Sequence, residues 1–297
     1  MPVVDLNLHH VRYLIAVVDD GHFGRAAARL YISAPSLSQQ IRKLERAVGA
    51  ELIDRSAHPL RPTPVGRRFL DDARVALAAA DRAVAAVDAH LREEKRTLRL
   101  GFMTASTGQH SRSMIAALRA RMPEAVVNLV ELPWPQQSSA VRDGSVDASL
   151  VRPPVADTEG LEFDVLRPEN RVAVLPADHR LAGRSAIAIG DLDGEVFVDD
   201  DEADPAWVRW WACDPRPSGV PVQYGPSVRT IDELLEAVAS GEAIALTGEF
   251  VADIYRRPDV VFVPVTDVAP CALSLCTRTG DRSTLVVALR RAVRSRE

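Results

Sequence analysis

The chain has 297 residues, of which 47% are apolar and 26% are charged, and its formal net charge is −5. This is the composition of an ordinary folded protein, and the length predicts two or three compact domains. No apolar run approaches the roughly 18–20 residues that cross a bilayer, and the N-terminus has neither a basic leader nor an apolar signal core. We therefore expect a cytoplasmic protein with no membrane partner.

The three cysteines, Cys213, Cys271 and Cys276, argue against a disulfide framework because their number is odd and the chain is long. Cys271 and Cys276 lie in an apolar run, which favours buried thiols. A redox pair or a metal site is the lesser interpretation, because no cluster of His or Cys accompanies them at ligand spacing.

The charge is divided unevenly along the chain. Residues 1–68 carry nine Arg and one Lys against six acids, a net +4, whereas the remainder carries 26 bases against 35 acids, a net −9. This asymmetry indicates a small N-terminal module that faces a polyanion and a larger body with another task.

The first 50 residues predict three helices. Apolar residues at helical spacing indicate a helix over 8–20, and an alanine-rich segment over 23–30 indicates a second, short one. Ser33 is a good N-cap and Pro35 is tolerated in a first turn, so the third helix begins at about Ala34. Gly49 is a natural residue to end it.

The third helix is amphipathic. The residues on its apolar face are Leu37, Ile41, Leu44 and Val48, and those on the opposite face are Ser36, Gln39, Arg42, Lys43 and Arg46. A solvated surface helix would look similar. However, the outward face has no acid at its centre, and Ser and Gln are side chains that contact base edges and phosphates in a major groove. Two preceding helices complete a helix-turn-helix pattern, so we favour DNA binding.

A two-stranded wing is predicted after the third helix. Residues 51–55 and 60–63 form its strands, and His58 and Pro59 form the turn. Arg55 and Arg61 flank this wing, where they could contact phosphates or remain solvated.

The segment AAARLYISAPSLSQQIRKLERAVGAELIDR, followed by RPTPVGRRFL, resembles the winged helix-turn-helix of the LysR-type transcriptional regulators. The order and spacing of the matching residues extend over about 60 positions. The three departures from the family pattern are Ala34, where the family commonly has Gln, Ile53, where it has Phe, and Pro64, where it has a freer residue after Thr. The first affects operator preference. The candidate DNA-binding residues are Ser33, Ser36, Ser38, Gln39, Gln40, Arg42, Lys43, Arg46, Arg55 and Arg61.

Residues 65–95 predict one long helix, because they contain no Gly or Pro after Gly66 and carry a stripe of small and apolar residues three or four apart. The stripe could pair with a second copy of the chain or pack on its own domain. In the resembled family the equivalent helix dimerises, which implies a dimer and leaves a tetramer open.

From Thr97 the pattern changes to strand, helix, strand, helix, strand, which predicts a parallel sheet covered by helices. Later segments repeat this pattern and indicate two small Rossmann-like α/β subdomains. This layout is similar to the effector-binding domain of the same family, which shares its architecture with periplasmic binding proteins. The expected domains are therefore a winged helix-turn-helix over 1–64, a linker helix over 65–95, and an effector-binding domain over 96–297. Its first subdomain comprises about 96–166 and 269–297, and the second comprises 167–268.

Ligands in such sheets bind beyond the carboxyl ends of strands. The resemblance implies effector contacts in the loop that holds Thr104 and Ser106. Ser106 or Thr107 could instead cap the next helix, and one residue can do both. The further candidates at strand ends are Trp134, Arg152, Asp199, Asp200, Tyr224 and Thr247. Arg152 suits an anionic ligand, whereas the aspartates favour a cationic or amine-bearing one unless they cap the following helix. Three tryptophans of that helix are expected to serve packing.

Together these features predict a ligand-responsive transcription factor that binds double-stranded DNA as a dimer or tetramer. Its partners would be DNA, a small-molecule effector, a second copy of the chain and, as a further candidate, RNA polymerase; no cofactor or metal is implied. A solute-binding module would not need the basic N-terminal segment. An α/β enzyme is disfavoured because the sequence has no Gly-rich phosphate loop, no G-x-S-x-G motif and no His-based metal spacing.

Overall fold

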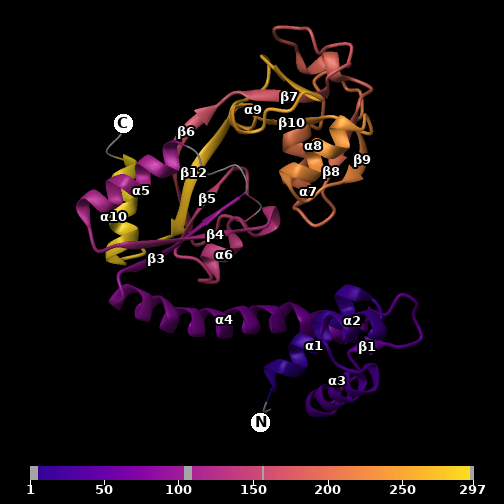
Figure 1. The fold of residues 1–297 in the computed structure, drawn as a ribbon. Helices are drawn as coiled ribbons and strands as arrows, with labels where there is room; N and C mark the ends of the chain where they lie inside the picture. The colour runs from indigo at the N-terminus through magenta and orange to yellow at the C-terminus, as the bar shows by residue number, and fades with distance from the viewer. Residues whose placement is uncertain (1–5, 104–108, 156, 295–297) are drawn as a thin grey trace. The chain divides into compact units, whose positions relative to one another are not determined.

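The computed structural model describes residues 6–103, 109–155 and 157–294. The chain separates into two compact units, residues 1–84 and residues 85–297, each of which is described by itself (Figure 1). Within the described ranges, no helix is both long and apolar enough to cross a membrane.

The N-terminal unit is a winged helix-turn-helix, as predicted. Its elements are α1 (Leu8–Asp20), α2 (Phe23–Arg29), α3 (Ala34–Val48), β1 (Ile53–Asp54), β2 (Arg61–Pro62) and the first part of α4 (Pro64–Glu94). The Ser33 hydroxyl accepts a hydrogen bond from the Ser36 N–H at 3.3 Å and begins α3, and Gly49, at φ 75°, ends it. Strands β1 and β2 pair antiparallel to form the wing.

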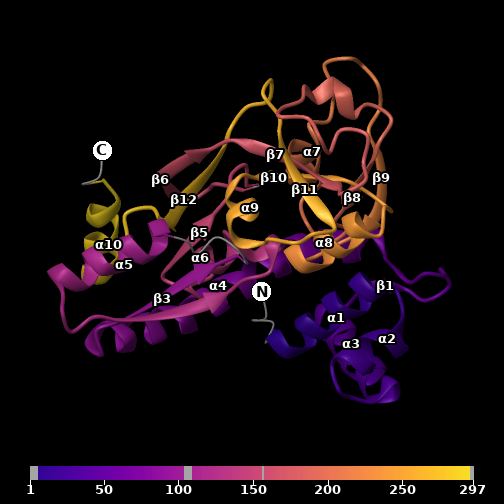
Figure 2. The same cartoon turned by 45° about the horizontal axis from the view of Figure 1, so that its top comes forward.

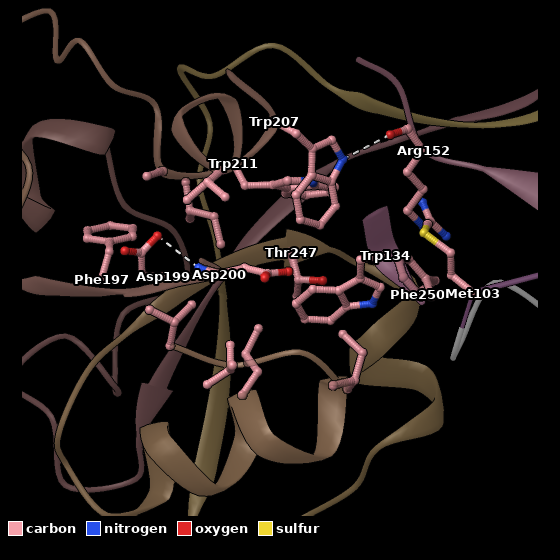
Figure 3. Close-up of a pocket in the computed structure, with 17 residues that line it drawn as sticks. Met103, Trp134, Arg152, Phe197, Asp199, Asp200, Trp207, Trp211, Thr247 and Phe250 are labelled. Atoms are coloured by element: carbon pink, nitrogen blue, oxygen red, sulfur yellow. Dashed lines mark hydrogen bonds between the residues drawn. The ribbon is translucent and has the colours of Figure 1, made fainter. Parts of the chain in front are cut away.

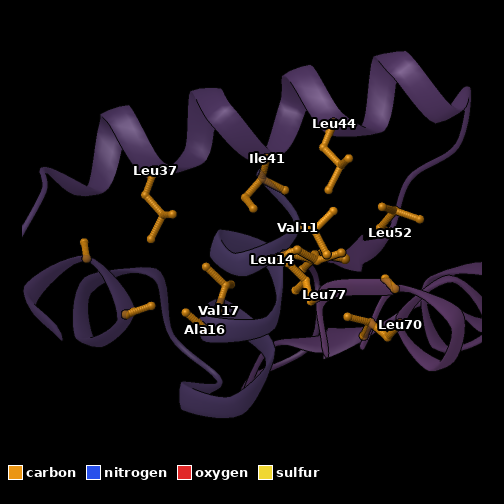
Figure 4. Packing of buried hydrophobic residues seen from close by; sticks show 14 residues of the cluster. Val11, Leu14, Ala16, Val17, Leu37, Ile41, Leu44, Leu52, Leu70 and Leu77 are labelled. Carbon is orange, nitrogen blue, oxygen red and sulfur yellow. The ribbon is translucent and has the colours of Figure 1, made fainter. Parts of the chain in front are cut away.

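The apolar face of α3 holds this unit together (Figure 4). Leu37, Ile41 and Leu44 are fully buried and point toward Val11 and Leu14 of α1. Burial of each such side chain contributes about 1.5–3 kcal/mol. The predicted orientation of α3 is therefore confirmed.

The apolar stripe of the long helix α4 is buried in its first part and exposed in its second. Ala73 and Leu77 are buried in the core of the N-terminal unit, so this part of the stripe packs on its own domain. Farther along, Val84, Val87 and Leu91 are exposed. At 100° per residue these three lie within a sector of about 60°, so they form one apolar strip.

The first subdomain of the C-terminal unit is built on a five-stranded sheet with the order β4-β3-β5-β12-β6. The strands are β3 (Thr97–Phe102), β4 (Val126–Glu131), β5 (Ala148–Val151), β6 (Leu161–Glu169) and β12 (Cys271–Arg278). As expected, β3 pairs in parallel with β4 and β5. The helices α5 (Gln109–Arg121) and α10 (Thr284–Arg294) pack together against it. The predicted helix after β4 is shorter than expected: a 3₁₀ turn, η1 (Trp134–Gln136), and one turn of α6 (Ser139–Arg142).

The sequence predicted the strand β12 but not the strand β6. Strand β12 pairs antiparallel with β5 and with β6, which makes the sheet mixed instead of parallel. Both strands are long, and they run side by side between the two subdomains (Figures 1 and 2). The segment that forms β6 was not predicted as a strand, because pairing with the distant β12 stabilises it.

The second subdomain has two small sheets, β10-β7-β11 and β8-β9. Its elements are β7 (Arg171–Pro176), η2 (Ile189–Leu192), β8 (Val196–Asp199), α7 (Pro205–Ala212), β9 (Gln223–Ser227), α8 (Ile231–Ala239), β10 (Ala245–Gly248), α9 (Phe250–Ile254) and β11 (Val260–Pro264). Strand β7 pairs antiparallel with both neighbours, whereas β8 and β9 are parallel. The chain passes between the subdomains after Glu169 and again before Cys271.

Candidate functional site

The outward face of α3 is a polar, basic surface. Gln39, Arg42, Lys43 and Arg46 are exposed, and Ser36, Ser38 and Gln40 are partly exposed. Among the described residues, the side chains of Gln39, Arg42 and Lys43 have no hydrogen-bond or ion-pair partner. The hydroxyl of Ser33, by contrast, is used as the helix cap. This surface is free to bind an external ligand.

The wing is fixed to α3 by a buried carboxylate. Glu45 accepts hydrogen bonds from the Leu52 N–H at 2.9 Å and the Ile53 N–H at 3.3 Å, and its other oxygen accepts from the Arg55 guanidinium at 2.7 Å. Arg55 is thus engaged within the unit, which the sequence did not indicate. Arg61, in β2, remains exposed.

The charge of Glu45 is stabilised by this arrangement. Burial pushes the pKa of Glu45 up, but the hydrogen bonds from Arg55, Leu52 and Ile53, together with the charge of Arg55, push it down further. The pKa is lowered below its ordinary value of 4.5, so the carboxylate is ionised at neutral pH.

A pocket of about 670 Å³, counting the part open to solvent, lies in the C-terminal unit (Figure 3). Residues of both subdomains line it. Five of the predicted effector residues are among them: Trp134, Arg152, Asp199, Asp200 and Thr247. The aromatic and sulfur side chains that complete it are Met103, Phe197, Trp207, Trp211 and Phe250, and aliphatic residues of α7, α8 and β10 fill the remaining wall.

One of the predicted residues that the structure describes, Tyr224, does not line this pocket. The phenol of Tyr224 donates a hydrogen bond to the Asp214 carboxylate at 3.1 Å, and Tyr224 packs in the core of the second subdomain. Burial raises its pKa above the ordinary value. Thr104 and Ser106 lie outside the described residues.

Arg152 is buried and already paired. Its guanidinium donates to the Glu169 carboxylate at 2.6 Å, and both side chains are at most 5% exposed. The guanidinium carbon also lies 3.5 Å from the centre of the Phe250 ring. Much of the positive charge of Arg152 is therefore compensated inside the protein.

Asp200 is the most unusual polar group of the pocket. One oxygen accepts hydrogen bonds from the N–H groups of Glu202 and Ala203, at 3.0 and 3.1 Å, while Oδ2 is buried with no partner among the described residues. Burial raises the pKa of Asp200 above 3.8, against the lowering effect of the two N–H groups. The cap of α7 is instead Asp204, which accepts from the Ala206 N–H.

Two of the tryptophans expected to serve packing also line the pocket. Trp207 and Trp211 are one helical turn apart on α7, so they share a face, whereas Trp210 stacks against Arg171 at 4.3 Å. The i, i+4 spacing was visible in the sequence, but the direction of that face was not.

Comparison with known proteins matches two separate segments of the chain. Residues 8–67 match "Bacterial regulatory helix-turn-helix protein, lysR family", and residues 91–297 match "LysR substrate binding domain". The chain belongs to the LysR family of transcriptional regulators. It is accordingly a DNA-binding regulator with an effector-binding domain and not an enzyme.

Among curated LysR regulators, the Hca operon transcriptional activator HcaR of Escherichia coli (strain K12) is 32% identical over 282 residues, which cover 93% of each chain. BenM of Acinetobacter baylyi is 26% identical over 293 residues, or 97% of this chain and 95% of BenM. The crystal structure of full-length BenM aligns with a TM-score of 0.56 over 98% of this chain and 96% of that one. CbnR, crystallised with its target DNA, shares the fold at 21% identity, with a TM-score of 0.55 over 98% of this chain and 99% of CbnR.

Proposed function

We propose that the outward face of α3 reads the operator of this LysR regulator. The observation that carries the proposal is the row of exposed side chains without internal partners, among them Gln39 and Arg42. In the major groove, an amide can form two hydrogen bonds with N6 and N7 of an adenine, and a guanidinium can form two with O6 and N7 of a guanine. CbnR, which has the same fold, is solved with its target DNA, and this supports the assignment.

Arg55 and Arg61 have different tasks in this proposal. Arg61 is exposed in the wing and contacts the phosphate backbone, where it adds affinity without sequence preference. Arg55 sets the position of the wing through Glu45. Ala34 begins α3 and provides no polar contact, so the bases near the N-terminus of the helix are read by Ser36 and Ser38.

The test is a fluorescence-anisotropy titration with duplexes selected from a random pool, at two salt concentrations. Arg42→Ala should weaken binding to the selected duplex by roughly 5- to 150-fold, the equivalent of about 1–3 kcal/mol. Arg184→Ala is the matched control, because it removes the same charge from an exposed site of the C-terminal unit. The proposal is wrong if no duplex is preferred over random DNA, or if both variants bind alike.

The pocket in the C-terminal unit is the effector site in the same proposal. It has an apolar, aromatic wall with a few polar groups, which is the usual composition of a small-molecule site. Residues of both subdomains line it, so an occupant changes the preferred spacing of the subdomains and thereby the arrangement of the oligomer.

We also infer that two chains pair through α4. The exposed strip of Val84, Val87 and Leu91 is apolar and has no partner within the described parts of the chain. Pairing would bury it and would bring two DNA-binding units to adjacent half-sites. Val87→Asp should reduce the sedimentation coefficient toward that of a monomer, whereas Val75→Asp, which is off this strip, should not. The regulator would act in the cytoplasm, with RNA polymerase as a candidate partner.

A further inference from the structure

We propose that the effector of this regulator is an organic cation, a small molecule with an apolar body and a protonated amine that pairs with Asp200. The inference rests on the proposed function, because it assigns a ligand class to the pocket described above. Three features of the pocket carry it: an unpartnered carboxylate oxygen, walls of aromatic rings, and the pairing of Arg152, the one cationic residue in the described lining, with an internal carboxylate.

The unpartnered oxygen is the first feature. Asp200 is 5% exposed, and its carboxylate points into the pocket beside Thr247 (Figure 3). Its Oδ1 is satisfied by two backbone N–H groups, but its Oδ2 has no donor among the residues that the structure describes. A buried acceptor left without a partner is unfavourable, and more so when it is charged. An ammonium group of a ligand would supply the missing donor together with the opposite charge.

The aromatic walls are the second feature. The ring centres of Trp134 and Trp207 lie 5.6 Å apart, and those of Trp207 and Trp211 lie 6.0 Å apart. In the view of Figure 3 the indoles of Trp207 and Trp211 are drawn above the Asp200 carboxylate and that of Trp134 below it, and all of these residues line the same pocket. The face of an indole attracts a cation through the negative potential above the ring. A cation bound to Asp200 would therefore also lie close to indole rings, which equally suit an apolar ligand body.

The positive charges near the pocket are the third feature. Arg152 is bound to Glu169 and stacked on Phe250, so an anionic ligand would have to compete with an internal carboxylate for it. Two further buried arginines approach from outside the lining. Arg171 donates to the main-chain carbonyls of Trp210 and Trp211, and Arg216 donates to that of Ile189 in η2. These acceptors are neutral, but neither arginine lines the pocket, so neither is placed to pair with a ligand there.

Two carboxylates that line the pocket, those of Asp199 and Asp200, have no cationic partner among the described residues. Asp199 accepts a hydrogen bond from the Asp200 N–H at 2.8 Å, and no described cation pairs with either residue. Asp201 and Glu202, which follow in the chain, are paired with Arg229 at the surface. An anionic ligand would thus be placed against two adjacent carboxylates, whereas an amine would neutralise one of them.

The test uses three probes with one shape and three charges: 2-phenylethylamine, 2-phenylethanol and phenylacetate. Each is titrated into the full-length protein by isothermal titration calorimetry at neutral pH, where the amine is protonated and the acid is ionised. The amine should bind at least about tenfold more tightly than either of the others, because it alone can donate a charge-assisted hydrogen bond to Asp200. Tenfold corresponds to about 1.4 kcal/mol.

Asp200→Asn isolates the proposed contact. The amide oxygen still accepts from Glu202 and Ala203, and the change removes a charge that is costly to bury, so the variant should fold. Its affinity for the amine should fall at least about tenfold. Asp201→Asn is the control, because it removes the same charge from an exposed side chain that does not line the pocket, and its affinity for the amine should be unchanged.

Three results would overturn the proposal: tighter or equal binding of phenylacetate or phenylethanol, no binding of the amine at millimolar concentration, or full amine affinity in Asp200→Asn. Operator binding by the unliganded protein is measured in parallel. If the operator is bound with sequence preference but the amine is not, the ligand class is wrong and the proposed function stands. If no operator preference is found, the proposed function fails whatever the amine does.

Discussion

Glu45→Ala is expected to unfold the N-terminal unit under mild conditions. Glu45 is 7% exposed and holds two backbone N–H groups of the wing, those of Leu52 and Ile53, as well as the guanidinium of Arg55. The substitution removes all of these acceptors at once. It leaves two donors on buried residues and a cation without its partner.

The size of the effect follows from these contacts. Each unsatisfied buried N–H costs about 1–3 kcal/mol, and breaking a buried ion pair by removing one partner costs about 3–5 kcal/mol. The full sum is not reached, because the Arg55 side chain is 32% exposed and water can replace part of the lost attraction. We expect a loss of about 3–5 kcal/mol, which is a large part of the 5–15 kcal/mol that stabilises a typical domain.

Urea denaturation can measure this loss for one unit at a time. All four tryptophans lie at or after position 134, so tryptophan fluorescence reports the C-terminal unit, whereas circular dichroism also reports α1, α2 and α3. Glu45→Ala should shift only the transition of the N-terminal unit. Glu51→Ala, at an exposed position of equal charge, should change stability by less than about 0.5 kcal/mol.

The same carboxylate makes stability depend on pH. Because the pKa of Glu45 is lowered in the folded state, its ionised form contributes stability that is fully present above its unfolded value near 4.5. That contribution is lost as the pH falls through the lower, folded value. In Glu45→Gln this acid dependence should be reduced. A loss below about 1 kcal/mol in Glu45→Ala, or an equal shift of the fluorescence transition, would refute the reasoning.

Two further predictions concern close packing and the thiols. Gly66→Ala should destabilise the N-terminal unit by about 1–3 kcal/mol, because an added Cβ would lie 2.0 Å from the Leu52 carbonyl oxygen. A urea midpoint equal to that of the wild type would contradict this. Burial raises the pKa of Cys271 to about 11 and that of Cys276 to about 12, so both thiols should resist Ellman's reagent at pH 8 until the protein unfolds. The half-buried Cys213 should react first, and equal rates for all three thiols in the folded protein would contradict the structure.

Elements that depend on neighbouring residues could be predicted from the sequence. The start of α3 at Ala34, its end at Gly49 and its buried face follow from a cap, a glycine and a helical period, and the structure has all three. The spacing along residues 8–67 was likewise enough to indicate the family. The strand β6 was missed, because only its pairing with the distant β12 stabilises it.

The pairing of buried polar groups could not be predicted in this way. From the sequence, Arg55 was expected to contact phosphates or to remain solvated, but its partner is the buried Glu45. From the sequence, Arg152 was a candidate to bind an anionic ligand, but it is paired with Glu169 and stacked on Phe250. In each case the partner is distant in sequence, and no local pattern states which groups the fold brings together.

By itself, the sequence determined the winged helix-turn-helix, the direction in which α3 faces and the alternation of strands and helices in the body, because these depend on contacts between residues near in the chain. Only the tertiary structure decided how the pocket is lined. In the folded protein Trp207 and Trp211 line the pocket, whereas Tyr224 is bonded to Asp214 outside it. One oxygen of Asp200 has no donor among the described residues. Those outcomes depend on packing between distant elements, and that packing sets which charges are compensated and which remain for a ligand.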